Sequence, residues 1–301
     1  MSDAPRVAVV VVSFEARESL LDGLRSVRAH ASSPLELVVV DNASRDGSAE
    51  AVRAARPEAL VIANPDNVGF ARAANQGWRV SRAPNVLFLN PDAELTPGAL
   101  ETLAGLLESR PEVGAAGPRT RSGDGSIQVS TGPDLTPLSE RRQRRLVRGV
   151  ARREPVALAE AEALHAREHE PAWVSGSCLM TRRAALEGVG GFDERFFLYE
   201  EDADLCRRMR AAGWRIVFTP AAEVRHALGR SMAEAPRRSR LEYHRSHLLY
   251  YHKHNGPVAL AALRLLLAAR GLGGWLRGQA SGDTAARADG LALVRLALER
   301  V

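Results

Sequence analysis

Short apolar runs alternate with segments of helical periodicity over the first third of the chain. The run at residues 7–12 is almost entirely valine, which is typical of a strand buried on both faces. Residues 18–30 follow it with leucines on one side of a helix. Further strands are predicted at 35–40, 59–63, 85–89 and 113–117, with helices at 48–55, 70–80 and 97–109 between them. Strands that alternate with helices predict an α/β fold with a doubly wound, mostly parallel sheet and flanking helices.

Residues 119–171 break this alternation. The stretch begins with a glycine turn at 123–126 and is rich in arginine over 140–153. The pattern predicts an irregular excursion, either solvated and partly mobile or forming a lip over an anionic ligand or a charged lipid surface. Regular elements resume with a strand at 173–180, a helix at 202–212, a strand at 215–218 and a long helix at 237–254.

The C-terminal segment predicts a helical appendage. An apolar helix is predicted at 257–269, with Arg264 inside it and Arg270 directly after it. The glycine run at 271–274 is predicted to break it, and a last helix is predicted at 284–300. Three roles remain open for the apolar helix: packing on the core, pairing with a second copy in a homodimer, or lying on a membrane surface. The expected organisation is one α/β domain over residues 1–255, including the excursion, and a helical extension over 256–301.

Composition narrows the function classes. Hydrophobic residues make up 45% of the 301, enough for a packed core, and the net charge of +5 is too small to indicate a nucleic-acid partner. Cys178 and Cys206 predict buried thiols in a reducing compartment, because neither belongs to a Cys-x-x-Cys pair. The N-terminus lacks a secretory pattern and no apolar run approaches the ~20 residues of a spanning helix, so a cytoplasmic location is expected.

Acidic side chains follow the ends of two predicted strands. In open α/β sheets the carboxyl ends of the strands form the ligand-binding edge. Asp92 follows the strand at 85–89, where a carboxylate can hold Mg²⁺ or Mn²⁺ on a diphosphate, or serve as a turn residue before a helix capped by Thr96. Asp41 can accept a hydrogen bond from a ribose hydroxyl or a base N–H, and it equally suits a turn.

A glycine turn opens the helix predicted at 70–80. Arg72 lies in its first turn, and together with Asn67 and Asn75 it forms a candidate cradle for a diphosphate. The alternative is a loop in which Gly69 is needed only for its positive φ angle.

A second acidic cluster occupies residues 200–204. Asp202 begins a helix, whose dipole favours the ionised carboxylate that a general base needs. The aromatic and apolar residues 196–199 before it are typical of a pocket wall, although the acids could simply stabilise the first turn of the helix. His226, further along, could complete a metal site with Asp92 or be an ordinary packed histidine.

Taken together, these segments resemble the inverting glycosyltransferases of family 2, which have the GT-A fold, and in particular their bacterial rhamnosyltransferase-type members. The resemblance covers residues 6–255, and the order and number of the motifs make it specific. Two features depart from the family pattern: Asn90 replaces the first acid of the Asp-x-Asp motif, which weakens cation affinity, and residues 15–17 replace a commoner tyrosine–asparagine stretch. The matching segments are 9–14, 38–44, 67–75, 87–92, 190–197, 201–206 and 226–231.

The resemblance implies an enzyme that moves a sugar from a nucleotide-diphosphate donor to a hydroxyl of a glycan or lipid-linked acceptor, in cell-wall or polysaccharide synthesis. Its candidate donor is dTDP-rhamnose, and its implied cofactor is Mg²⁺ or Mn²⁺. A lipid-linked acceptor would bring the enzyme to the inner face of the cell membrane.

The resemblance also implies roles for individual residues. Asp202 is the implied catalytic base, with Glu201 as its neighbour, and Asp92 and His226 are the implied metal ligands. The nucleotide contacts are implied for Ser13, Phe14, Glu15, Asp41 and Arg72. The acceptor side is implied for Trp173, Gly176, Gly191, Phe192 and Asp193.

Two rival functions stay open at this point. A nucleotidyltransferase would share the metal and nucleotide features, but it needs a glycine- and lysine-rich signature where residues 14–17 stand. A nucleotide-sugar-binding or scaffolding protein with a degenerate site is favoured by the neutral Asn90.

Overall fold

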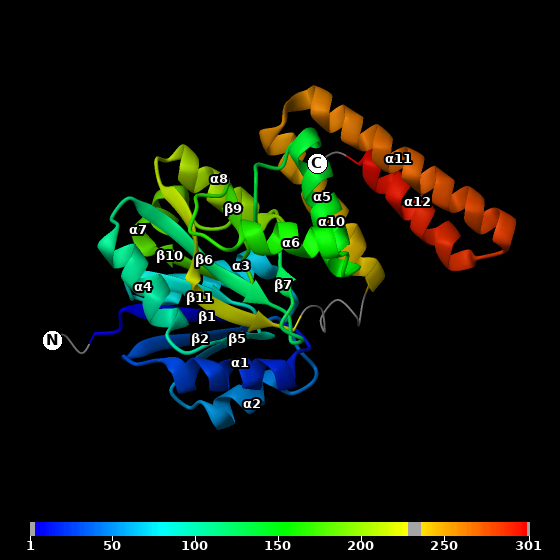
Figure 1. Ribbon diagram of the computed structural model, residues 1–301. Helices are drawn as coiled ribbons and strands as arrows, with labels where there is room; N and C mark the ends of the chain where they lie inside the picture. The colour runs from blue at the N-terminus through cyan, green and yellow to red at the C-terminus, as the bar shows by residue number, and fades with distance from the viewer. Residues whose placement is uncertain (1–3, 228–235, 300–301) are drawn as a thin grey trace. The chain divides into compact units, whose positions relative to one another are not determined.

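The computed structural model describes residues 4–227 and 236–299 (Figure 1). Within them, residues 4–195 and 201–227 form one compact unit, and residues 196–200 and 236–299 form a second. The helix at 236–254 therefore groups with the C-terminal helices, whereas the sequence pattern placed the boundary after residue 255.

The first unit is built on a sheet whose leading half is parallel, as predicted. Strands β1 (Val7–Ser13), β2 (Leu35–Asp41), β3 (Leu60–Ala63) and β4 (Asn85–Leu89) follow the order β3-β2-β1-β4. Their register places Ser13 beside Asp41. The polar residues that follow these strands consequently share one edge of the sheet.

The other half of the sheet is mixed. Strand β10 (Cys178–Arg182) runs antiparallel between β4 and β6 (Val113–Arg121), and β11 (Arg215–His226) runs parallel to β6. Short strands β5 (Ala93–Leu95) and β7 (Ile127–Gln128) pair with β11 and β6, and β8 (Thr131–Gly132) pairs with β9 (Trp173–Val174). The strand expected at 173–180 is thus two strands, separated by a turn at 175–177.

Helices cover both faces of this sheet. On one face, alternate β1 residues such as Val9 pack with leucines of α1 (Arg17–His30) and α4 (Ala99–Ser109), and α2 (Ser48–Ala55) contributes Val52. On the other face lies α3 (Phe70–Val80), where a Cβ at Gly77 would come within 2.4 Å of the Val10 side chain. Glycine at this position therefore lets α3 approach the sheet closely. Helices α7 (Arg183–Val189) and α8 (Glu201–Ala211) complete the first unit.

The expected start of α4 is wrong. Its N-cap is Gly98, with φ of 77°, rather than Thr96. The Thr96 hydroxyl instead donates a hydrogen bond of 2.7 Å to the Glu223 carbonyl, because β5 pairs with β11 just before the helix. The cap was mispredicted because the pairing of a three-residue strand is not visible in the sequence.

Residues 119–171 are more regular than the sequence suggested. They include α5 (Pro137–Ala151) and α6 (Pro155–Leu164), whose buried Leu146, Ala157 and Ala161 pack around Ile127. In the sequence, the many arginines of α5 hide the pattern of this small apolar face. Some of them pair with acids, as Arg144 does with Glu140 at 2.8 Å.

The second unit contains α10 (Pro236–His254), α11 (Gly256–Ser281) and α12 (Thr284–Leu298). The glycine run at 271–274 does not break α11, contrary to the sequence expectation. A Cβ at Gly271 would lie 2.7 Å from the Gly290 carbonyl oxygen, so the glycines let α12 pack closely against an unbroken helix. The expectation that no apolar run approaches the length of a spanning helix is also corrected. Among the described residues, α11 is the one helix long and apolar enough to cross a membrane, judged by length and composition alone.

The two cysteines behave as expected. Cys178 and Cys206 are both free and buried. Burial raises the pKa of each thiol to about 12, so both remain protonated and unreactive at neutral pH.

Candidate active site

The carboxyl ends of β1 and β2 present two polar atoms without partners. The Ser13 hydroxyl and one carboxylate oxygen of Asp41 are buried and make no hydrogen bond with the described residues. The other Asp41 oxygen accepts a hydrogen bond of 3.1 Å from the Ser44 amide, as in a turn. Because buried polar groups are nearly always satisfied, this neighbouring pair indicates a place where a ligand binds.

The loops after these strands are linked to each other. The Glu15 amide donates to the Ser44 hydroxyl at 2.9 Å, and its carboxylate accepts from the Arg45 amide at 3.0 Å. Glu15 and Ala43 have positive φ angles of 49° and 65°, so the links hold an otherwise unfavourable loop shape. The side chain of Glu15 is thus used within the protein, while the neighbouring Phe14 ring is 39% exposed.

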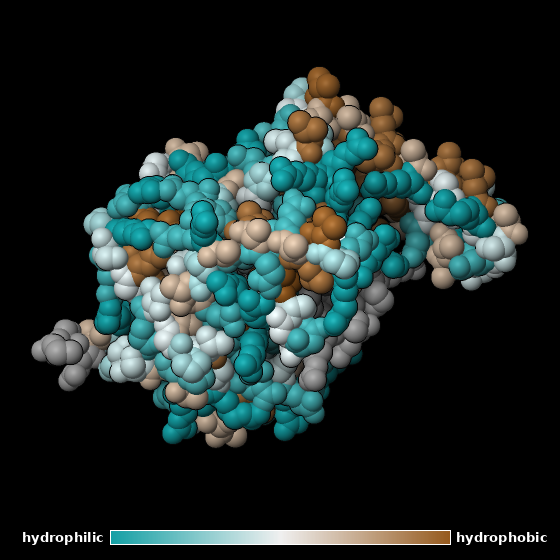
Figure 2. Space-filling model, viewed as in Figure 1, coloured by the Kyte–Doolittle hydropathy of each residue, from teal (hydrophilic) through white to brown (hydrophobic). Residues whose placement is uncertain are grey.

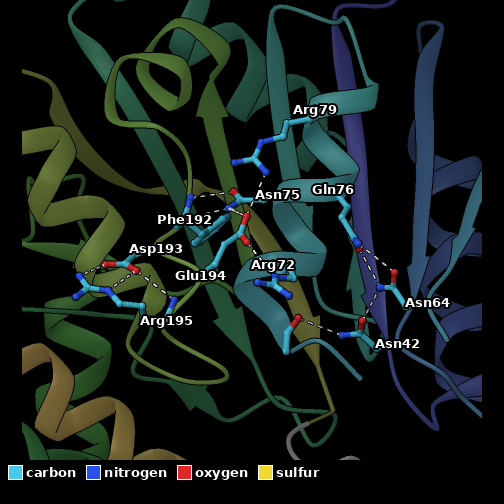
Figure 3. A network of polar contacts seen from close by, with 11 residues as sticks. Asn42, Asn64, Arg72, Asn75, Gln76, Arg79, Phe192, Asp193, Glu194 and Arg195 are labelled. Atoms are coloured by element: carbon cyan, nitrogen blue, oxygen red, sulfur yellow. Dashed lines mark hydrogen bonds and ion pairs between the residues drawn. The ribbon is translucent and has the colours of Figure 1, made fainter. Parts of the chain in front are cut away.

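A chain of side-chain amides joins β2 to α3 (Figure 3). Asn42 donates to the Gly69 carbonyl at 3.2 Å, and Asn64 bridges Asn42 and Gln76, at 2.9 Å from each. The Asn67 side chain accepts from the Gly69 amide at 3.0 Å, which makes it a turn residue.

Asn75 joins α3 to the loop at 190–194. Its amide donates to the Phe192 carbonyl at 2.9 Å, while its oxygen accepts from the Phe192 and Trp78 nitrogens at 3.0 and 2.9 Å (Figure 3). A Cβ at Gly191 would lie 2.5 Å from that oxygen, and the Phe192 ring is buried beside Phe88. These contacts place Asn75, Gly191 and Phe192 inside the protein, where they shape the loop.

Acidic residues of the same loop pair with arginines. Glu194 accepts from Arg72 at 3.0 Å and from Arg79 at 3.1 Å, and Asp193 pairs with Arg195 (Figure 3). Burial would raise the pKa of Glu194, but hydrogen bonds from Asn75, Arg72 and Arg79 outweigh it and lower that pKa. Glu194 therefore stays ionised and orients Arg72, whose side chain remains 56% exposed.

Asp92 and His226 meet at the end of β4. The pairing of β5 with β11 sets Ala93 opposite His226, and the imidazole Nε2 lies 3.1 Å from an Asp92 carboxylate oxygen. The Asn90 side-chain nitrogen lies 3.3 Å from the same Nε2. The two residues proposed as metal ligands are thus adjacent, although they are 134 positions apart in the chain.

Gln128 fixes the orientation of this histidine. Its amide nitrogen donates to the His226 carbonyl at 2.7 Å, so its oxygen faces Nδ1 at 3.0 Å. That geometry assigns a hydrogen to Nδ1 and turns the other ring nitrogen towards Asp92. The described residues contain no group of three or more histidine, cysteine or acidic side chains suited to one metal ion.

Asp202 stands at the start of α8. One carboxylate oxygen accepts from the Gly176 amide at 2.8 Å, and the other accepts from the Ala203 amide at 2.7 Å. The side chain is partly buried, and this burial raises the pKa of Asp202 above its ordinary 3.8 despite the two amides, which act to lower it. Each oxygen retains a lone pair that can accept a further hydrogen bond.

The proposed metal ligand Asp92 and the proposed base Asp202 share one edge of the sheet. The Asn90 amide donates to the Ser177 carbonyl at 2.9 Å, and the amide of the preceding residue, Gly176, donates to Asp202. Asp92 is two residues from Asn90, and each step along the backbone spans about 3.8 Å. The strand ends therefore bring both carboxylates into one neighbourhood.

The remaining predicted site residues differ in burial and in whether the structure describes them. Glu201 is buried, and the Trp173 indole nitrogen donates to the Pro133 carbonyl at 2.9 Å. Gln128 was not predicted, because a single glutamine in a two-residue strand carries no sequence signal. Gly229 and Ser231 of the predicted 226–231 motif lie outside the described residues.

Comparison with known proteins identifies the family. The family model described as "Glycosyltransferase like family 2" matches residues 5–243. The chain belongs to this glycosyltransferase family. It is similar to the N-acetylglucosaminyl-diphospho-decaprenol L-rhamnosyltransferase of Mycobacterium tuberculosis (strain ATCC 25618 / H37Rv), with 32% identity over 269 residues that cover 82% of this chain and 85% of the relative.

Solved structures show the same fold. This glycosyltransferase resembles a mannosyltransferase from Pyrobaculum calidifontis in complex with GDP-Man and Mn²⁺, with a TM-score of 0.59, 20% identity and coverage of 98% and 87% of the two chains. It also resembles GalNAc-T7 with UDP, GalNAc and Mn²⁺, with a TM-score of 0.55, 15% identity and coverage of 73% and 42%. The expected GT-A fold, the rhamnosyltransferase-type resemblance and the glycosyltransferase activity are confirmed.

Proposed function

We propose that this glycosyltransferase transfers a sugar, with inversion, from a nucleotide-diphosphate donor to a hydroxyl of a lipid-linked glycan. The observation that carries the proposal is the placement of Asp92 and Asp202 at one edge of the sheet, beside the unsatisfied Ser13 and Asp41. The relative from M. tuberculosis, by its name, attaches L-rhamnose to a decaprenol-linked N-acetylglucosamine. This similarity supports dTDP-rhamnose as the donor and a polyprenyl-diphosphate-linked sugar as the acceptor.

The nucleoside binds at the ends of β1 and β2. The free Asp41 oxygen accepts from a base N–H or a ribose hydroxyl, and the Ser13 hydroxyl supplies a donor beside it. The exposed Phe14 ring offers an apolar surface to the base. Arg72, oriented by Glu194, is the cation that faces the diphosphate.

The Asp92 and His226 pair fits a divalent cation. The Asp92 oxygen and the His226 nitrogen lie 3.1 Å apart and would hold Mg²⁺ or Mn²⁺ together with donor oxygens. The imidazole nitrogen favours Mn²⁺ over Mg²⁺. The bound cation would neutralise the charge that grows on the departing diphosphate. The Mn²⁺ in structural neighbours supports this assignment.

Asp202 acts as the general base. Its ionised carboxylate, held by the Gly176 and Ala203 amides, takes the proton from the acceptor hydroxyl. The hydroxyl oxygen then forms a bond to the anomeric carbon as the bond from that carbon to the diphosphate oxygen breaks. Trp173 and Asp193 border the acceptor side, while Gly176 fixes the position of the base.

A donor and acceptor screen tests this function. Incubation of the enzyme with Mn²⁺, dTDP-rhamnose and a short-chain N-acetylglucosaminyl-diphospho-polyprenol is expected to release dTDP and form a disaccharide lipid. Neither product should form when GDP-mannose replaces the donor. Release of pyrophosphate from a nucleoside triphosphate and a sugar phosphate would instead support a nucleotidyltransferase.

The raised pKa of Asp202 predicts an acidic limit to activity. Because the pKa is raised, the carboxylate gains a proton at a higher pH than an ordinary aspartate, and the base is lost as the pH falls through that value. We expect the logarithm of kcat/KM to decline with unit slope as the pH falls, and the decline should begin at a higher pH than an unperturbed aspartate would give. A flat profile down to the pH of acid unfolding, measured by circular dichroism on the same samples, would contradict the assignment.

Helix α11 supports contact with a lipid surface. Its buried residues are Leu263, Leu267, Gly271 and Gly278, and the two glycines lie against α12. Figure 2 shows hydrophobic residues gathered on the outside of α11 and α12, and Arg270 and Arg277 are exposed on α11 as well. The exposed apolar stripe of α11, which we call the outer stripe, consists of Val258, Ala262, Leu265, Ala269, Leu272 and Leu276. An apolar stripe beside arginines is suited to the interface of an anionic membrane, where a lipid-linked acceptor is found.

Vesicle flotation tests this contact. The enzyme is expected to float with phosphatidylglycerol vesicles at low salt, and the double substitution Leu265→Glu and Leu272→Glu should abolish flotation. Leu60→Glu, at an exposed position of β3, is the matched control and should still float. Flotation of the double variant at the wild-type level would show that the outer stripe does not bind lipid.

A further inference from the structure

Two consecutive residues before the proposed base have an unusual backbone. Tyr199 and Glu200 have φ angles of 72° and 63°, in the left-handed region that residues other than glycine rarely adopt. Glu201 and Asp202 follow at once and begin α8. Such conformations persist only where surrounding contacts enforce them, and they concentrate at functional sites.

Helix α10 supplies contacts to the segment that contains these residues, 196–200. The Ser246 hydroxyl donates to the Leu198 carbonyl at 2.7 Å, and the Tyr199 ring lies edge to face with Tyr243 at 5.9 Å. At the start of the segment, the Lys253 ammonium lies 5.8 Å from the centre of the Phe196 ring. Three turns of one helix thus contact three positions in a five-residue segment.

The contact nearest to the base is between Glu200 and His247. The His247 Nδ1 lies 2.7 Å from a Glu200 carboxylate oxygen, and both side chains are almost fully buried. The imidazole stacks on Tyr243, with ring planes 10° apart, and the Tyr251 ring lies 4.7 Å away, centre to centre. These rings leave His247 little freedom, so the oxygen of Glu200 is held at a fixed point.

We propose that His247 is a positioning residue for the base. By holding the Glu200 carboxylate, it keeps Tyr199 and Glu200 in their left-handed conformations, and these set the direction in which the backbone enters α8. The direction of that entry aims the Asp202 carboxylate, two residues further on. The inference rests on the proposed role of Asp202, and it makes turnover depend on the C-terminal helices as well as on the nucleotide-binding unit.

Two substitutions at residue 200 separate backbone conformation from charge. Glu200→Ala and Glu200→Gly both remove the carboxylate, but only glycine keeps a φ near 63° without strain. We expect the alanine variant to lose up to about 100-fold in kcat, the loss typical of a small misplacement of a catalytic group, and the glycine variant to lose much less. Equal kcat values for the two variants would overturn the proposal.

Substitution of His247 tests the same contact between His247 and Glu200. His247→Leu should lower kcat while the Kd for dTDP stays unchanged, and His247→Gln, which can still donate to Glu200, should recover part of the loss. His252→Leu makes the same change at an exposed position of α10 and should behave as wild type. Equal kcat for His247→Leu and wild type would also refute the positioning role.

Hydrogen exchange provides a readout that does not need turnover. The Gly176 amide donates to Asp202, so a displaced carboxylate exposes that amide to solvent. His247→Leu and Glu200→Ala should accelerate its exchange, with melting temperatures measured alongside to exclude general unfolding. If the wild-type enzyme transferred no sugar, the proposed function would fail while this measurement still decided the positioning role. Unchanged Gly176 exchange in both folded variants would refute it.

Discussion

Replacement of Asp202 by asparagine is expected to lower kcat by about 10²–10⁴-fold. Asparagine keeps the shape of the side chain and can still accept from one of the two amides that hold Asp202. It cannot take a proton from the acceptor hydroxyl at neutral pH. Because Asp202 makes no part of the proposed nucleoside site, the Kd for dTDP should change by less than a few-fold.

Steady-state kinetics and calorimetry on the same preparation check this result. Glu187→Gln, which alters an exposed acid on α7, serves as the control and should keep wild-type kcat. Azide offers a further test, since it attacks carbon without losing a proton. With Asp202→Ala, azide should restore cleavage of the donor and yield a glycosyl azide, whereas wild-type turnover by Asp202→Asn would remove the residue from its proposed role.

Replacement of Asp92 by asparagine is expected to remove the benefit of Mn²⁺. Among the described residues, the Asp92 carboxylate is the one anionic donor beside the His226 nitrogen, and Asn90 is already neutral. Loss of the cation forfeits several kcal/mol of stabilisation of the departing diphosphate, which corresponds to at least about 100-fold in kcat. The Kd for dTDP should become the same with Mn²⁺ and with a chelator.

Calorimetric titration of dTDP with and without Mn²⁺ measures this effect. Glu94→Gln is the matched control, because Glu94 lies two residues further along and its side chain is exposed on β5. It should retain the full response to Mn²⁺. If the Asp92→Asn variant kept the wild-type difference in Kd between Mn²⁺ and chelator, the cation would have to bind elsewhere.

The strands of the parallel half were predictable because each is a short apolar run, and β1 and β4 are buried along their whole length. Residues 7–12 are buried throughout, and α1, between β1 and β2, buries Leu20 and Leu24 at helical spacing. The polar residues that follow such strands must share an edge, so Asp41 and Asp92 could be placed there from the sequence.

Elements that are stabilised by partners far away in the sequence could not be predicted from local apolar patterns. The short β5 exists because it pairs with β11, and α5 and α6 bury only a narrow apolar face under many charges. From the sequence alone, the glycines of α11 predict the end of a helix. Opposite another helix, they instead permit close packing. In each case the deciding contact lies far along the chain.

In the candidate site, too, local sequence features could be read in advance and distant contacts could not. Residue type and position at element ends marked Asp92, His226 and Asp202 as candidates, and their roles stay predictions. The sequence did not reveal that the Asn75 amide is used inside the protein, or that Gln128 orients His226. The resemblance added the order of motifs, and the structure added the hydrogen bonds that connect Asn90, Ser177 and Gly176 to Asp202.

The configuration of the product's anomeric carbon tests the central claim most directly. A base at Asp202 that activates the acceptor for a single displacement must invert that carbon. Proton NMR of the disaccharide lipid formed from dTDP-β-L-rhamnose should therefore show an α-linked rhamnose. A β-linked product would mean that the configuration is retained, and would contradict the proposed mechanism.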